Sequence, residues 1–285
     1  MSKIPAYYGF WHHLGSWLLK TSSWLVLLFL IMPILVIIPL SFNVEPFFSF
    51  TEGMLTFQPE AYSLRWYTAI FTDDKWLLAI KNSFLIGFFA TLLATVLGTC
   101  AAVGLARDDM PARRLITALL LSPMIVPLII TAAGMFFFYS DLGLAGNYLG
   151  VIIAHAALGT PFVIITVTAT LTGFDYSLAR AALNLGATPL RVFFDIIMPL
   201  IRPGVISGAL FAFITSFDEV VVILFMAGPQ QRTIPRQMFS GLREQISPSI
   251  LAIATLLILM SIALLITIEL LRRRATRMRG IETIE

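Results

Sequence analysis

Residues 149–171 read LGVIIAHAALGTPFVIITVTATL, a stretch that contains no Asp, Glu, Lys or Arg. A helix of about 20 apolar residues crosses the hydrocarbon core of a bilayer, so this stretch predicts a transmembrane helix. Working outward from it, four further charge-free runs occupy residues 21–44, 82–106, 115–140 and 245–268. A sixth run, residues 203–225, is apolar except for Asp218 and Glu219. The sequence therefore predicts an all-α polytopic membrane protein with six transmembrane helices.

The composition excludes the other broad classes of protein. Of the 285 residues, 58% are hydrophobic and only 12% are charged, whereas a soluble domain carries about 25% charged residues. A water-soluble globule and a disordered chain are both excluded. A disulfide scaffold is excluded as well, because Cys100 is the sole cysteine. The first apolar run is too long for the apolar region of a signal peptide, and it is expected to remain as an uncleaved helix.

The basic residues predict how the chain is oriented in the membrane. If the N-terminus is inside, 13 of the 19 Lys and Arg residues are cytoplasmic, and these lie within residues 1–20, 107–114, 180–202 and 272–279. The positive-inside rule therefore places both termini in the cytoplasm. We expect a cytoplasmic N-terminal segment (1–22), a transmembrane domain (23–271) and a cytoplasmic basic tail (272–285). The net charge of +3 is explained by lipid and topology, with no nucleic-acid partner.

Two outer loops carry residues suited to a membrane surface or to a partner. The loop of residues 43–81 contains Trp66 and Tyr67, which favour the interface. The loop of residues 226–246 is expected to contain a short amphipathic helix whose apolar side is formed by Met238, Phe239 and Leu242. Both loops are suited either to docking an extracytoplasmic partner or to lying on lipid.

The inner loop of residues 173–202, here called the arm, is predicted to contain helices rather than to be a flexible connection. Asp175 or Ser177 is suited to cap a helix that runs through residues 178–185. Gly186 then supplies the residue at which a helix commonly stops. The first half of the arm is therefore predicted to be one short helix.

The second half of the arm is predicted to be another helix. Thr188 followed by Pro189 is typical of an N-cap and first helical position. This helix is expected to carry Val192 and Ile196 and to end at Pro199. Apolar side chains on an inner loop need cover, which either the protein's own transmembrane helices or a cytoplasmic partner can provide.

The spacing in the arm resembles a family signature. Arg180-Ala181-Ala182, three residues, Gly186, nine residues and then Ile196-Ile197-Met198-Pro199 resemble the "EAA" pattern E-A-A-x3-G-x9-I-x-L-P. That pattern marks the membrane subunits of binding-protein-dependent ABC importers, and the resemblance covers about residues 20–275. The spermidine/putrescine permease branch is further resembled at Ser63-Leu64-Arg65-Trp66-Tyr67, at Asn82-Ser83 and at Ser216-Phe217-Asp218-Glu219-Val220-Val221.

The resemblance implies a transport subunit of the bacterial inner membrane that catalyses no covalent reaction. Its partners would be a second permease subunit, a dimer of ATP-binding subunits, an extracytoplasmic solute-binding protein and the lipid bilayer. ATP and Mg²⁺ would be held by the ATPase, since this chain has no G-x4-G-K-[ST] motif and needs no cofactor of its own. Coupling to the ATPase would involve Arg180, Ala181, Ala182, Gly186 and Pro199.

One position departs from the family pattern. Arg180 stands where the signature begins with glutamate. Either the ATPase groove carries a compensating acidic residue, or the neighbouring apolar contacts are sufficient.

Asp218 and Glu219 are the candidates for a solute site. An ionised side chain in hydrocarbon costs about 2.5–3.5 kcal/mol on insertion scales, so such residues face an interior rather than lipid. If the run is one helix, the two acids point about 100° apart, and Thr215 lies three residues before Asp218. The functional interpretation is a carboxylate pathway for an amine-bearing solute that includes Asp218, Glu219 and Thr215. The structural interpretation is a pair bonded to backbone or to the partner subunit.

Several alternatives remain open on the sequence. Pro123 and Pro127 predict a kink in the third transmembrane helix, but the residues that follow them carry no acid. A single acidic locus makes an ω-amino acid or an opine-like solute an alternative to a polyamine. Two other classes of protein are alternatives to an ABC importer subunit: a stand-alone secondary transporter and a membrane enzyme using His155 and Asp218. His155 itself is expected to be a packed, hydrogen-bonded residue.

Overall fold

The computed structural model describes residues 9–107, 109–172, 174–244 and 247–278, with side chains to Ala263 except at Glu244, and at Leu265 and Ile266. These residues form helices and loops, and their sole β-type pairing is an isolated bridge between Asn43 and Tyr62. The predicted all-α class is confirmed. The chain divides into two compact units, residues 1–72 with 241–285 and residues 73–240. Each unit is described by itself.

The first unit contains two long helices and the outer loop. Its polar side chains hold that loop together: Trp66 Nε1 donates to the Asn43 carbonyl at 2.8 Å, and the Tyr67 and Ser41 hydroxyls are 2.6 Å apart. Trp66 and Tyr67 therefore fasten the loop to the end of the first helix. The elements are α1 (Phe10–Leu40), α2 (Glu52–Leu55), a 3-10 turn (Pro59–Ala61), α3 (Arg65–Thr72) and α13 (Ser249–Met278).

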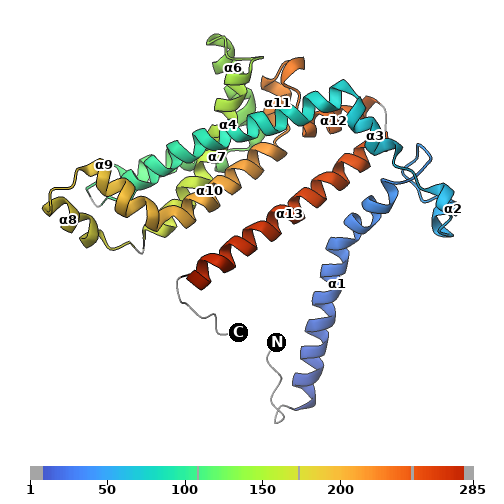
Figure 1. Cartoon of the computed structure of the whole chain (residues 1–285), viewed down its shortest axis with the longest axis horizontal. Helices are drawn as coiled ribbons and strands as arrows, with labels where there is room; N and C mark the ends of the chain where they lie inside the picture. The colour runs from blue at the N-terminus through green and yellow to red at the C-terminus, as the bar shows by residue number, and fades with distance from the viewer. Residues whose placement is uncertain (1–8, 108, 173, 245–246, 279–285) are drawn as a thin grey trace. The chain divides into compact units, whose positions relative to one another are not determined.

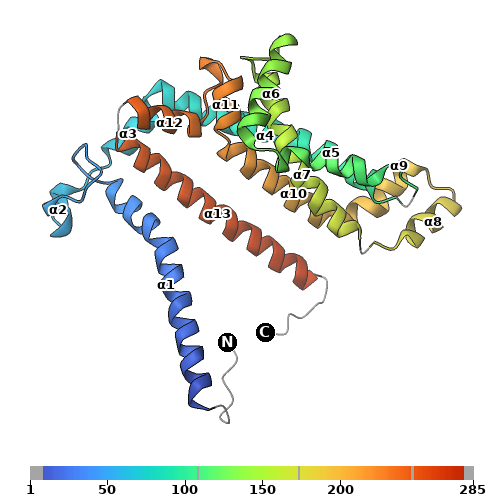
Figure 2. The same ribbon diagram turned by 180° about the vertical axis from the view of Figure 1, so that it is seen from behind.

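The second unit is built around three long helices that lie side by side (Figure 1; Figure 2). These are α4 (Asp74–Leu105), α7 (Tyr148–Leu171) and α10 (Met198–Asp218). The arm lies at one end of α10, and the short helix α11 lies at the other (Figure 1). The remaining elements are α5 (Arg113–Ile125), α6 (Leu128–Asp141), α8 (Tyr176–Asn184), α9 (Pro189–Val192), a π-turn (Phe193–Ile197), α11 (Val221–Met226), a 3-10 turn (Pro229–Gln231) and α12 (Ile234–Glu244), which begins in this unit and ends in residues assigned to the first.

Four helical stretches of the described residues are long and apolar enough to cross a membrane. A fifth is obtained if α5 and α6, which meet at 104°, count as one interrupted span. The break lies at Val126 and Pro127, because a residue before proline is driven to extended backbone and Val126 has ψ 137°. The predicted kink is confirmed. In α13 the described apolar part reaches from Ser249 to Ala263, so the count of six spans is not confirmed.

Two predicted helix ends are wrong. The second helix of the arm was expected to end at Pro199, but α9, the π-turn and α10 form one continuous helix, Pro189–Asp218. The π-turn Phe193–Ile197 immediately precedes Pro199, and such a turn shifts the hydrogen bonding where proline supplies no N–H. Conversely, the predicted span of residues 203–225 is not one helix, because Glu219 has extended backbone with ψ 121°.

The interface between α7 and α10 depends on glycine. A Cβ added to Gly159 would lie 3.0 Å from the Cβ of Ala212, and one added to Gly208 would lie 2.8 Å from the Cα of Val163. Neither helix could keep this separation with a larger residue at these positions. The two helices therefore pack in one register, in the manner of small-residue contacts between membrane helices.

Gly208→Leu is expected to destabilise the protein by about 1–3 kcal/mol, because the new side chain would overpack this interface. The thermal unfolding midpoint of the purified subunit in detergent measures the effect. Gly104→Leu is the matched control on α4, since a Cβ at Gly104 meets nothing within 4 Å. Equal midpoints for the two variants would contradict the prediction.

Candidate functional site

The arm has the local structure that its sequence predicts. Asp175 caps α8 by accepting a hydrogen bond from the Ser177 N–H at 2.9 Å. This hydrogen bonding from Ser177 lowers the pKa of the Asp175 carboxyl below its usual value. Gly186 follows α8 with φ +87°, a conformation that L side chains rarely adopt. Thr188 caps the next helix by accepting from the Arg191 N–H at 3.4 Å, so both caps and the glycine turn are confirmed.

The surface of the arm is apolar and exposed. Leu185 is 89% exposed and Leu190 is 72% exposed. Arg180 and Ala181 are exposed and Ala182 is half-buried, while Pro199 lies exposed within α10. Beside them the arm holds a pocket of about 320 Å³, lined by Ala182, Leu185, Gly186, Ala187, Arg191, Val192, Asp195 and Ile196. The arm thus presents exposed apolar side chains beside a pocket whose lining also includes the ion pair of Arg191 and Asp195, with Nε and Oδ2 3.3 Å apart.

The two acids of the fifth predicted span have different environments. Asp218 is the last residue of α10 and is exposed, whereas Glu219 is 7% exposed. The Glu219 Oε1 accepts a hydrogen bond from the Val222 N–H at 2.9 Å and so caps α11. The expectation that the acids are 100° apart on one helix is wrong, because the helix ends between them. Thr215 lies one turn before this end and is half-buried.

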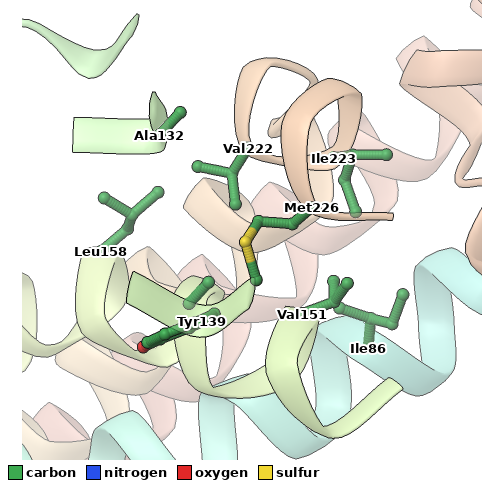
Figure 3. Packing of buried hydrophobic residues seen from close by; sticks show 9 residues of the cluster. Ile86, Ala132, Tyr139, Val151, Leu158, Val222, Ile223 and Met226 are labelled. Carbon is green, nitrogen blue, oxygen red and sulfur yellow. The ribbon is translucent and has the colours of Figure 1, made fainter. Parts of the chain in front are cut away.

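The helix α11 is held at its other end by an arginine that the sequence did not point to. The Arg236 Nη1 donates to the carbonyls of Ala227 at 2.7 Å and Gly228 at 3.2 Å. A carboxylate at the N-terminus and a guanidinium at the C-terminus both suit the helix dipole. Val222, Ile223 and Met226 of α11 are buried in an apolar cluster with residues of α4, α6 and α7 (Figure 3).

Glu219→Ala is expected to destabilise the protein by about 1 kcal/mol through loss of this cap. Glu219→Gln is expected to remain close to the wild type, because an amide oxygen can accept the same hydrogen bond from Val222. Thermal unfolding midpoints in detergent compare the two variants. If Ala and Gln lower the midpoint equally, the Glu219 side chain does not act as a cap.

The segment that follows α11 is fixed by side chains of α4 and α7. Asn82 Nδ2 donates to the carbonyls of Gln230 at 2.8 Å and Arg232 at 2.9 Å. The Tyr148 hydroxyl lies 2.9 Å from the Asn82 Oδ1, and the Ser83 Oγ accepts from the Ile234 N–H. The pair Asn82-Ser83, noticed in the sequence only as a resemblance, therefore holds the loop that leads to α12. The predicted amphipathic helix in this loop is confirmed as α12.

His155 is packed and hydrogen-bonded, as expected. Its Nδ1 lies 2.8 Å from the Oγ of Ser216, joining α7 to the last turn of α10. Both residues are buried, with 1% and 5% of their surface exposed.

Comparisons with known proteins show which sequences this chain resembles. Residues 94–277 match the family "Binding-protein-dependent transport system inner membrane component". The spermidine/putrescine transport system permease protein PotC of Haemophilus influenzae is 30% identical, with coverage of 86% of this chain and 93% of that protein. The putrescine transport system permease protein PotI of Escherichia coli K12 is 33% identical, with coverage of 81% and 82%.

A solved structure shows the same fold. The crystal structure of a bacterial alginate ABC transporter, in complex with a periplasmic protein bound to alginate pentasaccharide, matches with a TM-score of 0.64. It covers 92% of this chain and 94% of the matched chain at 17% identity. The family match spans more than half of the chain, and the relatives named above match most of their length. This chain belongs to the family of binding-protein-dependent transport system inner membrane components.

Proposed function

We propose that this protein is the membrane-spanning subunit of an ATP-driven importer and translocates a polyamine-like or other amine-bearing small solute by alternating access. It would work in the bacterial inner membrane, with both termini in the cytoplasm. Its partners would be a second permease subunit, a pair of ATP-binding subunits and an extracytoplasmic solute-binding protein. The relatives named for spermidine and putrescine support the choice of solute, and the alginate transporter with its periplasmic protein supports the binding-protein partner.

The observation that carries the proposal is the continuous helix Pro189–Asp218. It begins in the arm and ends at the exposed Asp218, a length of 30 residues or about 45 Å. A movement imposed on the apolar surface of the arm would therefore reach Asp218 through one helix. ATP and Mg²⁺ would act on the partner ATPase, and this subunit would supply the mechanical connection and the solute pathway.

Asp218 would be the solute-contacting acid of the pair. An exposed carboxylate at the end of a membrane helix faces water or protein rather than lipid. A carboxylate is also the natural partner of an ammonium group, because such hydrogen bonds are charge-assisted. Glu219 is already engaged in capping α11, so a direct role in the pathway falls to Asp218, with Thr215 beside it on the preceding turn.

The same geometry favours an alternative solute class. With Glu219 engaged, this chain offers one exposed carboxylate at the helix end, which matches one ammonium group. An ω-amino acid or an opine-like solute carries one such group, whereas a polyamine would need a second acid from the partner permease.

Reconstitution of the whole complex in proteoliposomes, with its ATPase and binding protein, tests the proposal. Putrescine, spermidine and an ω-amino acid are added in turn, and both uptake and ATP hydrolysis are measured. One of the amines is expected to stimulate hydrolysis and to accumulate. Accumulation by this subunit without any ATPase would identify a secondary transporter and overturn the proposal.

A further inference from the structure

The buried pair His155 and Ser216 connects α7 to the end of α10. Along Gly159, Ala212 and Gly208 the two helices are in close contact through small residues. The hydrogen bond between His155 Nδ1 and Ser216 Oγ, at 2.8 Å, lies at the end of the interface nearest Asp218. Ser216 precedes Asp218 by two residues in the last turn of the helix. The pair therefore restrains the turn that carries the exposed acid.

One ring nitrogen of His155, Nδ1, has a hydrogen-bond partner. His155 Nε2 is buried and has no hydrogen-bond partner among the described residues. Burial of a polar ring atom without a hydrogen-bond partner costs free energy. Nε2 therefore stays unsatisfied whatever Nδ1 does, a cost that an apolar side chain of similar size would avoid. Packing alone does not account for a histidine here, whereas the bond to Ser216 does.

We infer that His155 is a positioning residue: through Ser216 it fixes the last turn of α10 and so determines how Asp218 meets the solute. The inference rests on the proposed function, since it assigns Asp218 to the solute pathway. It adds a residue on α7 that never touches the solute. Glu219, the residue after Asp218, has extended backbone that ends the helix. In the terminal turn the ring of Phe217 packs against Phe84 of α4, and the bond to His155 is the polar restraint on this turn from α7.

The first test separates solute affinity from turnover in the reconstituted complex. His155→Leu keeps the volume but loses the bond, and Ser216→Ala removes the same bond from the other side. Both are expected to raise the KM for putrescine uptake about fivefold, the change that corresponds to one hydrogen bond, with kcat nearly unchanged. The double variant is expected to show no further rise, because both changes remove one interaction. Thr160→Val is the control on α7, because the Thr160 hydroxyl bonds only within its own helix, to the Ala156 carbonyl.

The second test asks whether His155 acts through Asp218. The double variant with Asp218→Asn and His155→Leu is expected to have the same KM as Asp218→Asn alone. An unchanged KM in the assembled Ser216→Ala and His155→Leu complexes would overturn the inference. A fivefold effect that persists without the Asp218 carboxylate would overturn it as well. If His155→Leu fails to assemble, Ser216→Ala, the smaller change, decides.

Hydrogen exchange gives a readout that needs no solute. Backbone amides of residues 214–222 are expected to exchange faster in Ser216→Ala than in the wild-type complex, and Thr160→Val is expected to leave them unchanged. Equal exchange in Ser216→Ala and wild type would contradict the restraint. If the wild-type complex takes up no amine, the proposed function fails, and the exchange measurement still tests the His155 pair independently.

Discussion

Replacing Gly186 with aspartate is expected to lower solute uptake at least about tenfold while the complex still assembles and hydrolyses ATP. Gly186 is exposed and lines the pocket of the arm. Space is available there, since a Cβ at Gly186 meets nothing within 4 Å. The damage would come from placing a carboxylate on an apolar contact surface, where docking would remove its water. Folding of the transmembrane helices would not depend on it.

Gly186→Asn is the matched control for this variant. The glycine has φ +87°, and among residues with a side chain Asn and Asp adopt the left-handed region most readily. The asparagine variant therefore shares the backbone strain of the aspartate and lacks its charge. Uptake and ATP hydrolysis are measured together in proteoliposomes. Normal ATP-dependent uptake by Gly186→Asp would show that this surface of the arm does not couple ATP hydrolysis to uptake.

The parts of the arm that the sequence predicts correctly are those decided by neighbouring residues. Asp175 caps the amide two residues on, Thr188 caps the amide three residues on, and Gly186 supplies a backbone conformation. Each of these interactions is complete within one turn of chain. The residue types at these positions are therefore sufficient to predict them.

The structure around Asp218 could not be predicted in the same way, because it depends partly on residues that are distant in the sequence. A hydropathy pattern reads residues 203–225 as one span, yet the helix ends at Asp218. The alternative is stabilised by the Glu219 cap and by Arg236, which lies 9 residues from the Ala227 carbonyl it binds. His155 and Ser216 are 61 residues apart. The prediction that the arm helix ends at Pro199 was also wrong, because the π-turn before this proline allows the helix to continue.

The resemblance to a family led to the correct family and to the arm. The interpretation of Asp218 and Glu219 came instead from the cost of placing an ionised side chain in hydrocarbon, which left open which of the two faces the pathway. The structure separates them: Glu219 belongs to the scaffold of α11, and Asp218 remains at the helix end.

Asp218→Asn is expected to raise the solute concentration for half-maximal uptake by at least about tenfold. A hydrogen bond between an ammonium group and a carboxylate contributes about 1.5–3 kcal/mol, and each 1.4 kcal/mol is a factor of ten in affinity. Asparagine keeps the shape and one acceptor oxygen but loses the charge. Because Asp218 is exposed at the end of α10, the change is not expected to disturb packing, and basal ATP hydrolysis should persist.

Glu219→Gln is the control that separates the two acids. It replaces the neighbouring carboxyl group by an amide while keeping an acceptor for the Val222 N–H, so it is expected to leave apparent affinity within about twofold of the wild type. Uptake titrations with putrescine and with an ω-amino acid compare the two variants in the same assembled complex. A solute that depends on this one carboxylate would lose affinity in Asp218→Asn alone. Unchanged uptake and affinity in Asp218→Asn would exclude Asp218 from the pathway, and an equal loss in Glu219→Gln would mean that both acids act together despite the helix ending between them.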